Sequence, residues 1–183
     1  MKRFFFTVTT ILLFATAASA QKVYTKNGLI SFFSKTALEN IKADNNQVLS
    51  VLNTQTGELQ FSVLTKGFHF PKAMMEEHFN AEYMESSKYP KSTFKGTVAD
   101  IAAINFTKDG SYPVTVRGDL NIHGVTKSIS STGTINIKTG KINVSSKFIV
   151  SPADYNISIP KVYRENIAKS IEITVNCNLD QKI

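Results

Sequence analysis

The stretch GSYPVTVRGDLNIHGVTKSIS, from Gly110 to Ser130, decides the fold class. In its first half apolar side chains recur at every second position, and polar side chains such as Thr115, Asp119 and His123 stand between them. A period of two is typical of a β-strand with one buried face. Gly124 then marks a turn into a second strand, so this stretch predicts an antiparallel hairpin.

The same alternation recurs on both sides of the hairpin. With a polar turn over 42–46, we expect further strands over residues 28–35, 47–53, 58–65, 92–101, 129–137, 142–150 and 171–179. The total is about eight, the number at which a closed antiparallel barrel can hold one small ligand. We therefore expect a mainly β protein whose interior is either a packed core or a pocket.

Residues 71–87 break the alternation, because apolar and aromatic side chains from Met74 to Met84 recur there at intervals of three and four. This spacing predicts one short helical insertion of about three turns. The helix either packs on the sheet or covers the mouth of the barrel. In the second case Met75 and Phe79 would border a pocket, and flexible methionines would suit variable apolar ligands.

The first twenty residues have the features of a signal peptide. Lys2 and Arg3 precede an apolar run, and Ala18-Ser19-Ala20 offers a small-residue cleavage site. The alternative is a membrane anchor, but the apolar run is shorter than the roughly 20 residues that span a bilayer. We expect a signal peptide over 1–20, one domain over 21–183, and an exported protein that is periplasmic or secreted.

Composition narrows the classes of function. The formal net charge is +7, but the lysines are scattered and the chain has no Trp, so we expect no nucleic-acid partner. Cys177 is the single cysteine, which excludes an internal disulfide. It shares its strand parity with Ile173, Val175 and Leu179, which favours a small buried hydrophobe over a reactive thiol.

No catalytic or metal-binding pattern stands out. The three histidines are not spaced as metal ligands, and the chain lacks a GxSxG elbow, a P-loop and a dinucleotide fingerprint. His123 lies on the polar parity beside a turn, so we expect a solvated turn residue there. The sequence thus predicts no catalytic residue, no metal, no cofactor and no enzymatic activity.

The inward-facing residues are the candidates for binding an apolar ligand. On strand parity and helix position, the lumen candidates are Leu59, Phe61, Val63, Phe68, Phe70, Met75, Phe79, Phe94, Val116, Leu120, Phe148, Ile173 and Val175. Gly96, Gly118 and Gly133 share the inward parity, so we expect them to leave room for a ligand. On this basis Gly118→Phe should block a bound chain and leave the barrel formed.

Three segments together resemble the YceI-like family of exported bacterial lipid-binding proteins. They are HFNAEYMESSKYPKSTFKG (78–96), LNIHGVTKSIS (120–130) and FIVSPADYNISIP (148–160), in the family's order. The resemblance implies an extended lipocalin-like antiparallel barrel that holds a polyisoprenoid or similar lipid in its lumen without catalysis. One departure is Tyr155-Asn156, where the family often has Phe-Gly. Asn tolerates a left-handed backbone better than most residues.

Two hypotheses of function follow. The first is an exported binding protein that holds an isoprenoid-tailed or other long-chain lipid for transport, storage or sequestration, as a monomer or homodimer with possible peripheral contact to envelope membranes. The alternative is an envelope stress or interaction protein whose barrel is filled by its own side chains. A lipid that copurifies in stoichiometric amount would separate the two.

The signal-peptide hypothesis makes the first testable prediction. Protein exported from the cell should have an intact mass that begins at Gln21, because signal peptidase accepts the small residues at Ala18 and Ala20. Mass spectrometry of the exported protein measures this directly. A mass that still includes residues 1–20 would contradict cleavage.

Overall fold

The computed structural model describes residues 22–182, and within that range nine strands form one antiparallel sheet. Their bounds are β1 Lys22–Lys35, β2 Asn40–Asn53, β3 Glu58–Leu64, β4 Lys91–Val98, β5 Gly110–Ile122, β6 Val125–Lys138, β7 Lys141–Val150, β8 Ile171–Leu179 and β9 Gln181–Lys182. The proposed signal peptide and its cleavage site lie outside the described residues.

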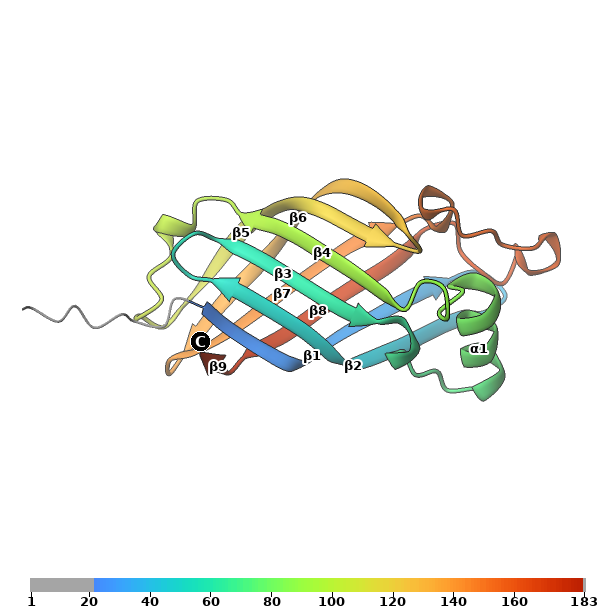
Figure 1. Cartoon of the computed structure of the whole chain (residues 1–183), viewed down its shortest axis with the longest axis horizontal. Helices are drawn as coiled ribbons and strands as arrows, with labels where there is room; N and C mark the ends of the chain where they lie inside the picture. Colours follow the sequence, from blue (N-terminus) through green and yellow to red (C-terminus); the bar gives the residue numbers. More distant parts are fainter. Residues whose placement is uncertain (1–21, 183) are drawn as a thin grey trace, which may run out of the picture.

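Pairing of β1 with both β2 and β8 closes strands β1 to β8 into a barrel (Figure 1). The short β9 adds to the start of β1 through Val23 and Tyr24. The fold is therefore mainly β, a closed eight-stranded antiparallel barrel with one short helix, as the sequence predicts. Closure leaves no long unpaired edge at the β1 side, where an open sheet would expose one.

Two tight turns give the barrel its hairpins. His123-Gly124 joins β5 to β6 and Thr139-Gly140 joins β6 to β7, and all four of these residues have positive φ. Two successive positive φ values define the type I′ turn, whose twist matches that of the flanking strands. The hairpin predicted from residues 110–130 is confirmed.

The predicted turn at 42–46 is wrong. These residues lie inside β2, where Lys42 faces Phe33 and Asp44 faces Ser31 on β1. The chain reverses instead at 36–39, where the Thr36 amide donates to the Glu39 carbonyl (3.1 Å). A polar run reads as a turn in the sequence, but the ladder to β1 holds it extended.

Two bulges explain why the start of the barrel is difficult to predict. Thr25 faces Ser50, Gly28 faces Val48 and Ile30 faces Asn45, so each strand carries one extra residue. A bulge reverses which parity points inward. Val23 and Ile30, of the same strand but opposite parity, are consequently both buried.

The helical insertion is shorter and less regular than one helix over 71–87. An α-helix, α1, spans Ala73–His78 and continues as a π-helical turn, η2, over Phe79–Tyr83. The Met84 amide donates to the Phe79 carbonyl (2.8 Å), which is the i to i−5 bond of a π-helix. This segment lies at the end of the barrel opposite the C-terminus (Figure 1).

The remaining elements are short 3-10 turns in the connections between strands. They are η1 Thr65–Gly67, η3 Ile101–Ala103, η4 Pro152–Tyr155 and η5 Lys161–Tyr163. The last two belong to the connection between β7 and β8, which extends beyond the barrel at the same end as α1 (Figure 1). This end therefore carries the two longest connections of the barrel, from β3 to β4 and from β7 to β8.

The expectation that Gly96 and Gly118 leave room for a ligand is wrong. The two glycines face each other across β4 and β5, and the ring of Phe94 lies over them. A Cβ at Gly118 would collide with the Lys95 carbonyl oxygen and the Gly96 Cα, and would lie 2.8 Å from Phe94 Cζ. Packing of an aromatic ring over strand glycines fills the space that the missing side chains vacate.

This packing makes the second testable prediction. Gly118→Ala should destabilise the protein by about 1–3 kcal/mol, the usual cost of overpacking a well-packed site, and Gly118→Phe should prevent folding of the barrel. Lys95→Ala, an exposed change on the facing strand, should stay within about 0.5 kcal/mol. Urea denaturation measures both variants. A Gly118→Ala variant as stable as the parent would show that the site has spare room.

Candidate apolar cavity

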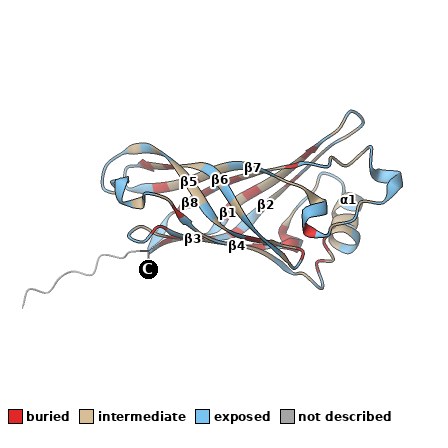
Figure 2. Cartoon of the chain, turned by 90° about the horizontal axis from the view of Figure 1, so that it is seen from above, coloured by how far each residue is buried: buried red, intermediate tan, exposed pale blue. Residues whose placement is uncertain are grey.

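The barrel encloses a cavity of about 1080 Å³. This volume lies just above the ~300–1,000 Å³ range typical of small-molecule pockets. The cavity wall includes Leu52 and Ile135 on the strands, and it extends to Met74 and Val162 at the end that carries α1 and η5. Figure 2 shows buried residues gathered along the strands, and exposed residues prevail on the connections at both ends.

The opposite end of the barrel is filled. Side chains that belong to the buried core but do not line the cavity are Val23, Val48, Ile104, Ile137, Ile142, Cys177 and Leu179. Cys177 is 0 % exposed, and burial raises the pKa of its thiol to about 12. The interior is thus a packed core at one end and a pocket at the other.

All of the lumen candidates predicted from the sequence line this cavity. Leu59, Phe61, Val63, Phe94, Val116, Leu120, Phe148, Ile173 and Val175 line it from the strands, and Phe68, Phe70, Met75 and Phe79 line it near the mouth. Of the three glycines, only Gly133 borders the cavity. That these residues contact a bound ligand is a proposal developed below.

Sequence reasoning missed a second group of lining residues. They are Ile30, Phe32, Ile41, Leu52, Ile129, Ile135, Val144, Ile157, Ile159, Val162, Tyr163 and Ile167. For the residues on β1 and β2, the bulges change which side chains point inward, so simple alternation in the sequence does not predict their orientation. The lining residues from Ile157 onward lie in an irregular segment after β7. The only sequence pattern that could have indicated them is the apolar alternation of Ile157 and Ile159.

Four phenylalanines form a cluster at the mouth. The Phe79 ring centroid lies 5.4 Å from that of Phe32, 5.7 Å from Phe68 and 5.1 Å from Phe70. The three contacts are stacked, edge-on and tilted, in that order, and such contacts at these distances are favourable beyond the area that the rings bury. The cluster joins η2 to β1 and to the segment after β3, and so it fixes the helical insertion against the rim.

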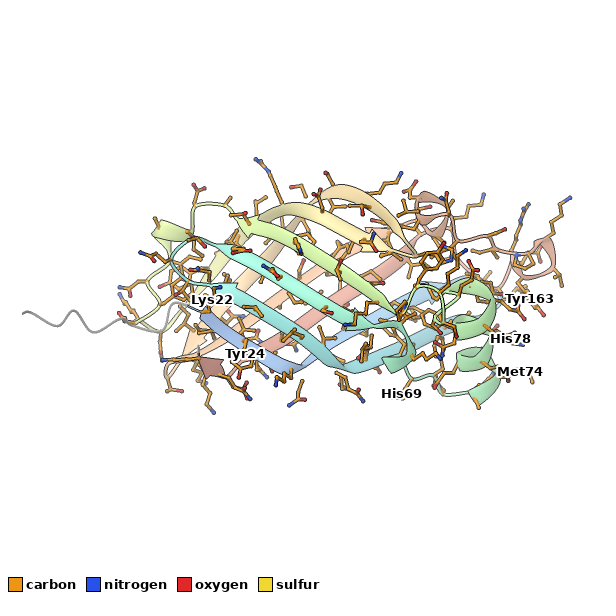
Figure 3. All side chains as sticks on the ribbon, viewed as in Figure 1. Lys22, Tyr24, His69, Met74, His78 and Tyr163 are labelled. Carbon is orange, nitrogen blue, oxygen red and sulfur yellow. The ribbon has the colours of Figure 1, made fainter. Side chains whose placement is uncertain are left out.

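Contacts at Glu39 connect the three segments around the mouth. Its carboxylate oxygens lie 3.5 Å from Lys72 Nζ, just before α1, and 3.3 Å from the Asn166 amide nitrogen, after η5. The Ala168 amide also donates to Ser34 Oγ (2.9 Å). Tyr83 and Tyr163 both line the cavity, and burial and the charges of Glu82 and Tyr163 raise the pKa of Tyr83. Figure 3 shows Met74, His78 and Tyr163 together at this end.

The helical insertion therefore covers the mouth and does not pack along the outer face of the sheet. Within the helix α1 no residue is fully buried, and Met74 is 69 % exposed. Met74, Met75 and Phe79 nevertheless all border the cavity. The helix thus partly shields an apolar opening.

His123 is not the solvated turn residue that its parity suggests. Its side chain is 8 % exposed, with Nε2 2.9 Å from Glu85 Oε2 and Nδ1 3.2 Å from the Tyr155 carbonyl oxygen. A carbonyl only accepts, so Nδ1 donates. The Tyr89 ring packs edge-on at 4.4 Å between centroids. The parity rule failed because the left-handed turn turns this side chain away from the face of its strand.

This histidine clasp ties three segments together at the mouth end. Glu85 follows η2, Tyr155 ends η4, and His123 stands between β5 and β6. Glu85, His123 and Asn156 all have positive φ. A left-handed backbone conformation at a residue other than glycine costs free energy. The contacts of the clasp and the packing around it must offset this cost at all three residues. Burial and the charge of Asp154 raise the pKa of the Tyr155 hydroxyl.

The chemistry available at the cavity is limited. Across residues 22–182, no group of three or more His, Cys, Asp or Glu side chains is placed to hold a metal ion. The same range holds no helix that is long and apolar enough to cross a membrane. Most of the cavity wall is aliphatic or aromatic, so it can exclude water from an apolar ligand but offers few groups for proton transfer.

A closed antiparallel β-barrel with a deep apolar cavity defines a lipocalin-like barrel. Within that class the chain belongs to the YceI-like family, because the YceI-like domain matches residues 16–179. No curated protein matches the chain.

Similar solved structures agree with this fold. A polyisoprenoid binding domain from Saccharophagus degradans, implicated in plant cell wall breakdown, superposes with a TM-score of 0.74 at 15 % identity and covers 86 % of this chain and 97 % of its own. BcnA of Burkholderia cenocepacia gives a TM-score of 0.65 at 14 % identity, over 81 % and 94 %. The YceI protein of Campylobacter jejuni gives 0.52 at 14 % identity, over 99 % and 100 %.

The histidine clasp makes the third testable prediction. His123→Asn keeps a residue that tolerates positive φ but loses one or both contacts, so it should destabilise the protein by about 1–3 kcal/mol. His69→Asn should change stability by less than about 0.5 kcal/mol, because His69 is largely exposed and its Glu76 contact is 3.5 Å long. Thermal melts measure both. Equal melting temperatures for the two variants would show that the clasp contributes nothing.

Proposed function

We propose that this protein is a non-enzymatic binder of an isoprenoid-tailed or other long-chain lipid, with the apolar chain in the cavity. The single observation that carries the proposal is the 1080 Å³ cavity, whose wall is mostly aliphatic and aromatic. Burial of a hydrocarbon contributes on the order of 25 cal/mol per Å² of apolar surface. A long flexible chain can use such a deep cavity along its length.

The relatives support the lipid class. One similar structure is a polyisoprenoid binding domain, and its barrel matches this one over most of both chains. At 15 % identity the ligand of that domain does not transfer by similarity alone. The cavity of this chain supplies the independent argument, because an interaction protein with a self-filled barrel has no need of a hollow interior.

The lining residues have distinct proposed roles along the chain of the ligand. Leu59, Val116 and Val175 surround the deep part of the cavity, and the phenylalanine cluster of Phe32, Phe68, Phe70 and Phe79 grips the ligand nearer the mouth. Met74 and Met75 adapt to ligands of different width, because methionine is unbranched and polarizable.

We further propose that the protein is exported and collects its lipid from an envelope membrane, for transport, storage or sequestration. Leu38, Met74 and Val162 project at the mouth end with 65 %, 69 % and 74 % of their surface exposed. Exposed apolar side chains beside an opening are suited to brief insertion into a lipid surface. The oligomeric state, monomer or homodimer, stays a prediction.

The direct experiment is organic extraction of protein purified from its native envelope, followed by mass spectrometry. The proposal expects a long-chain lipid at close to one molecule per protein. Absence of lipid, together with failure of the emptied protein to take up a fluorescent polyprenyl probe, would contradict it.

A substitution at the mouth makes the fourth testable prediction. Met75→Asp should weaken binding of the polyprenyl probe at least about tenfold, because an ionised carboxylate is costly at an apolar wall. Met75 is only half-buried, so thermal stability should change little. Ile149→Asp is the matched control, since Ile149 lies near the same end of the barrel on β7, is 60 % exposed and does not line the cavity. Equal effects of the two changes on binding would contradict a pocket wall at Met75.

A further inference from the structure

The barrel wall splits between β6 and β7. Strand β6 pairs with β5 from Val125 to Ile137, but its ladder to β7 runs only from Gly133, opposite Ser146, to Lys138, opposite Lys141. Toward the end that carries α1, the described residues form no further β6–β7 pair, although both strands continue. Figure 1 shows this part of β6 arching along the upper edge of the barrel.

A second split, between β2 and β3, is sealed. There the ladder covers only Leu49–Leu52, but the segment after β3 returns to β2. Asp44 and His69 exchange two backbone hydrogen bonds (3.2 and 2.9 Å), and the Asn45 side chain donates to the Leu64 carbonyl (2.9 Å). The β6–β7 split is spanned only at its rim, by the His123–Tyr155 hydrogen bond of the histidine clasp (3.2 Å) and by the exposed Lys127–Asp154 ion pair (4.0 Å).

The cavity lies directly behind this split. Ile129 and Ser131 of β6 and Phe148 and Val150 of β7 lie along the unpaired stretch, and all four line the cavity. No β6–β7 ladder therefore covers this part of the cavity wall, and we call this stretch the lateral opening of the barrel.

A pair of serine hydroxyls stands at the closed corner of this opening. Ser131 Oγ lies 3.0 Å from Ser146 Oγ, and Ser146 Oγ donates to the Thr132 carbonyl (2.7 Å). The Ser131 hydroxyl proton is directed to Ser146 Oγ or to the same carbonyl (3.2 Å). A hydroxyl has one donor and two acceptor positions. Because both serine hydroxyl protons are already donated within the protein, the two oxygen atoms can only accept a hydrogen bond from a ligand.

We propose that this lateral opening binds the hydroxyl end of a neutral lipid alcohol, with O–H of the ligand donating to the Ser131–Ser146 pair. The inference rests on the proposed lipid-binding function and specifies its head group. Neutral hydroxyls favour an uncharged end group, and free lone pairs favour a donor over an ether or a ketone. At the mouth, by contrast, Glu39 and Lys72 are charged and already paired.

Three probes with the same C20 chain test this: geranylgeraniol, its methyl ether and the corresponding hydrocarbon. For the parent protein, the alcohol should bind roughly three- to tenfold more tightly than the ether, the range of one net hydrogen bond. S131A/S146A should abolish that preference, leave hydrocarbon affinity unchanged and melt near the parent temperature. Ser131→Thr, which retains a hydroxyl, should keep the preference.

The outcomes separate this inference from the proposed function. Binding of all three probes with equal affinity by the parent protein would overturn the head-group site alone. An alcohol preference that survives in S131A/S146A would place the hydroxyl elsewhere and would also overturn it. Failure of the parent protein to bind any of the probes would overturn the proposed function and the head-group site together.

Discussion

Closure of the sheet through β1 is the constraint on which the rest of the structure depends. β1 pairs with β2 along most of its length and with β8 from Leu29 to Phe33, and these two ladders turn a flat meander into a barrel. A closed barrel of eight strands has an interior that its own side chains only just fill. The choice of side chain at each inward position then determines whether the interior is solid or hollow.

The chain makes that choice differently at the two ends. Ile137, Ile142, Cys177 and Leu179 meet at the end where tight turns hold the strands together, and they pack the lumen. The other end carries the two longest connections, from β3 to β4 and from β7 to β8, and their apolar side chains form a rim instead of a plug. The filled end stabilises the fold, so the open end can carry a cavity without loss of the barrel.

The open end is held by few but specific contacts. The phenylalanine cluster, the Glu39 contacts and the histidine clasp each join segments that are distant in sequence. Between them the β6–β7 split leaves part of the wall unpaired. Because these contacts are separate from one another, the opening can widen locally while the β-ladders of the rest of the barrel stay intact.

The sequence by itself determined the strands with clean alternation, from Glu58 to Leu64 and from Gly110 to Lys138, and with them the inward face that supplies the lumen candidates. It also indicated the family through motifs that are local in the chain. Alternation is a local property of a strand, so one sequence is enough to recognise it.

Only the tertiary structure determined the features that depend on contacts between residues distant in the sequence. The bulges at β1 and β2 come from the pairing between those strands, and they reverse the facing of residues such as Ile30. The ladder between the same two strands keeps residues 42–46 extended. Burial of His123 depends on Glu85 and Tyr155, and the space over Gly118 depends on the Phe94 ring from the next strand. Whether the lumen is hollow, and where its wall opens, depends on volumes and ladder lengths summed over the whole barrel, which no local pattern encodes.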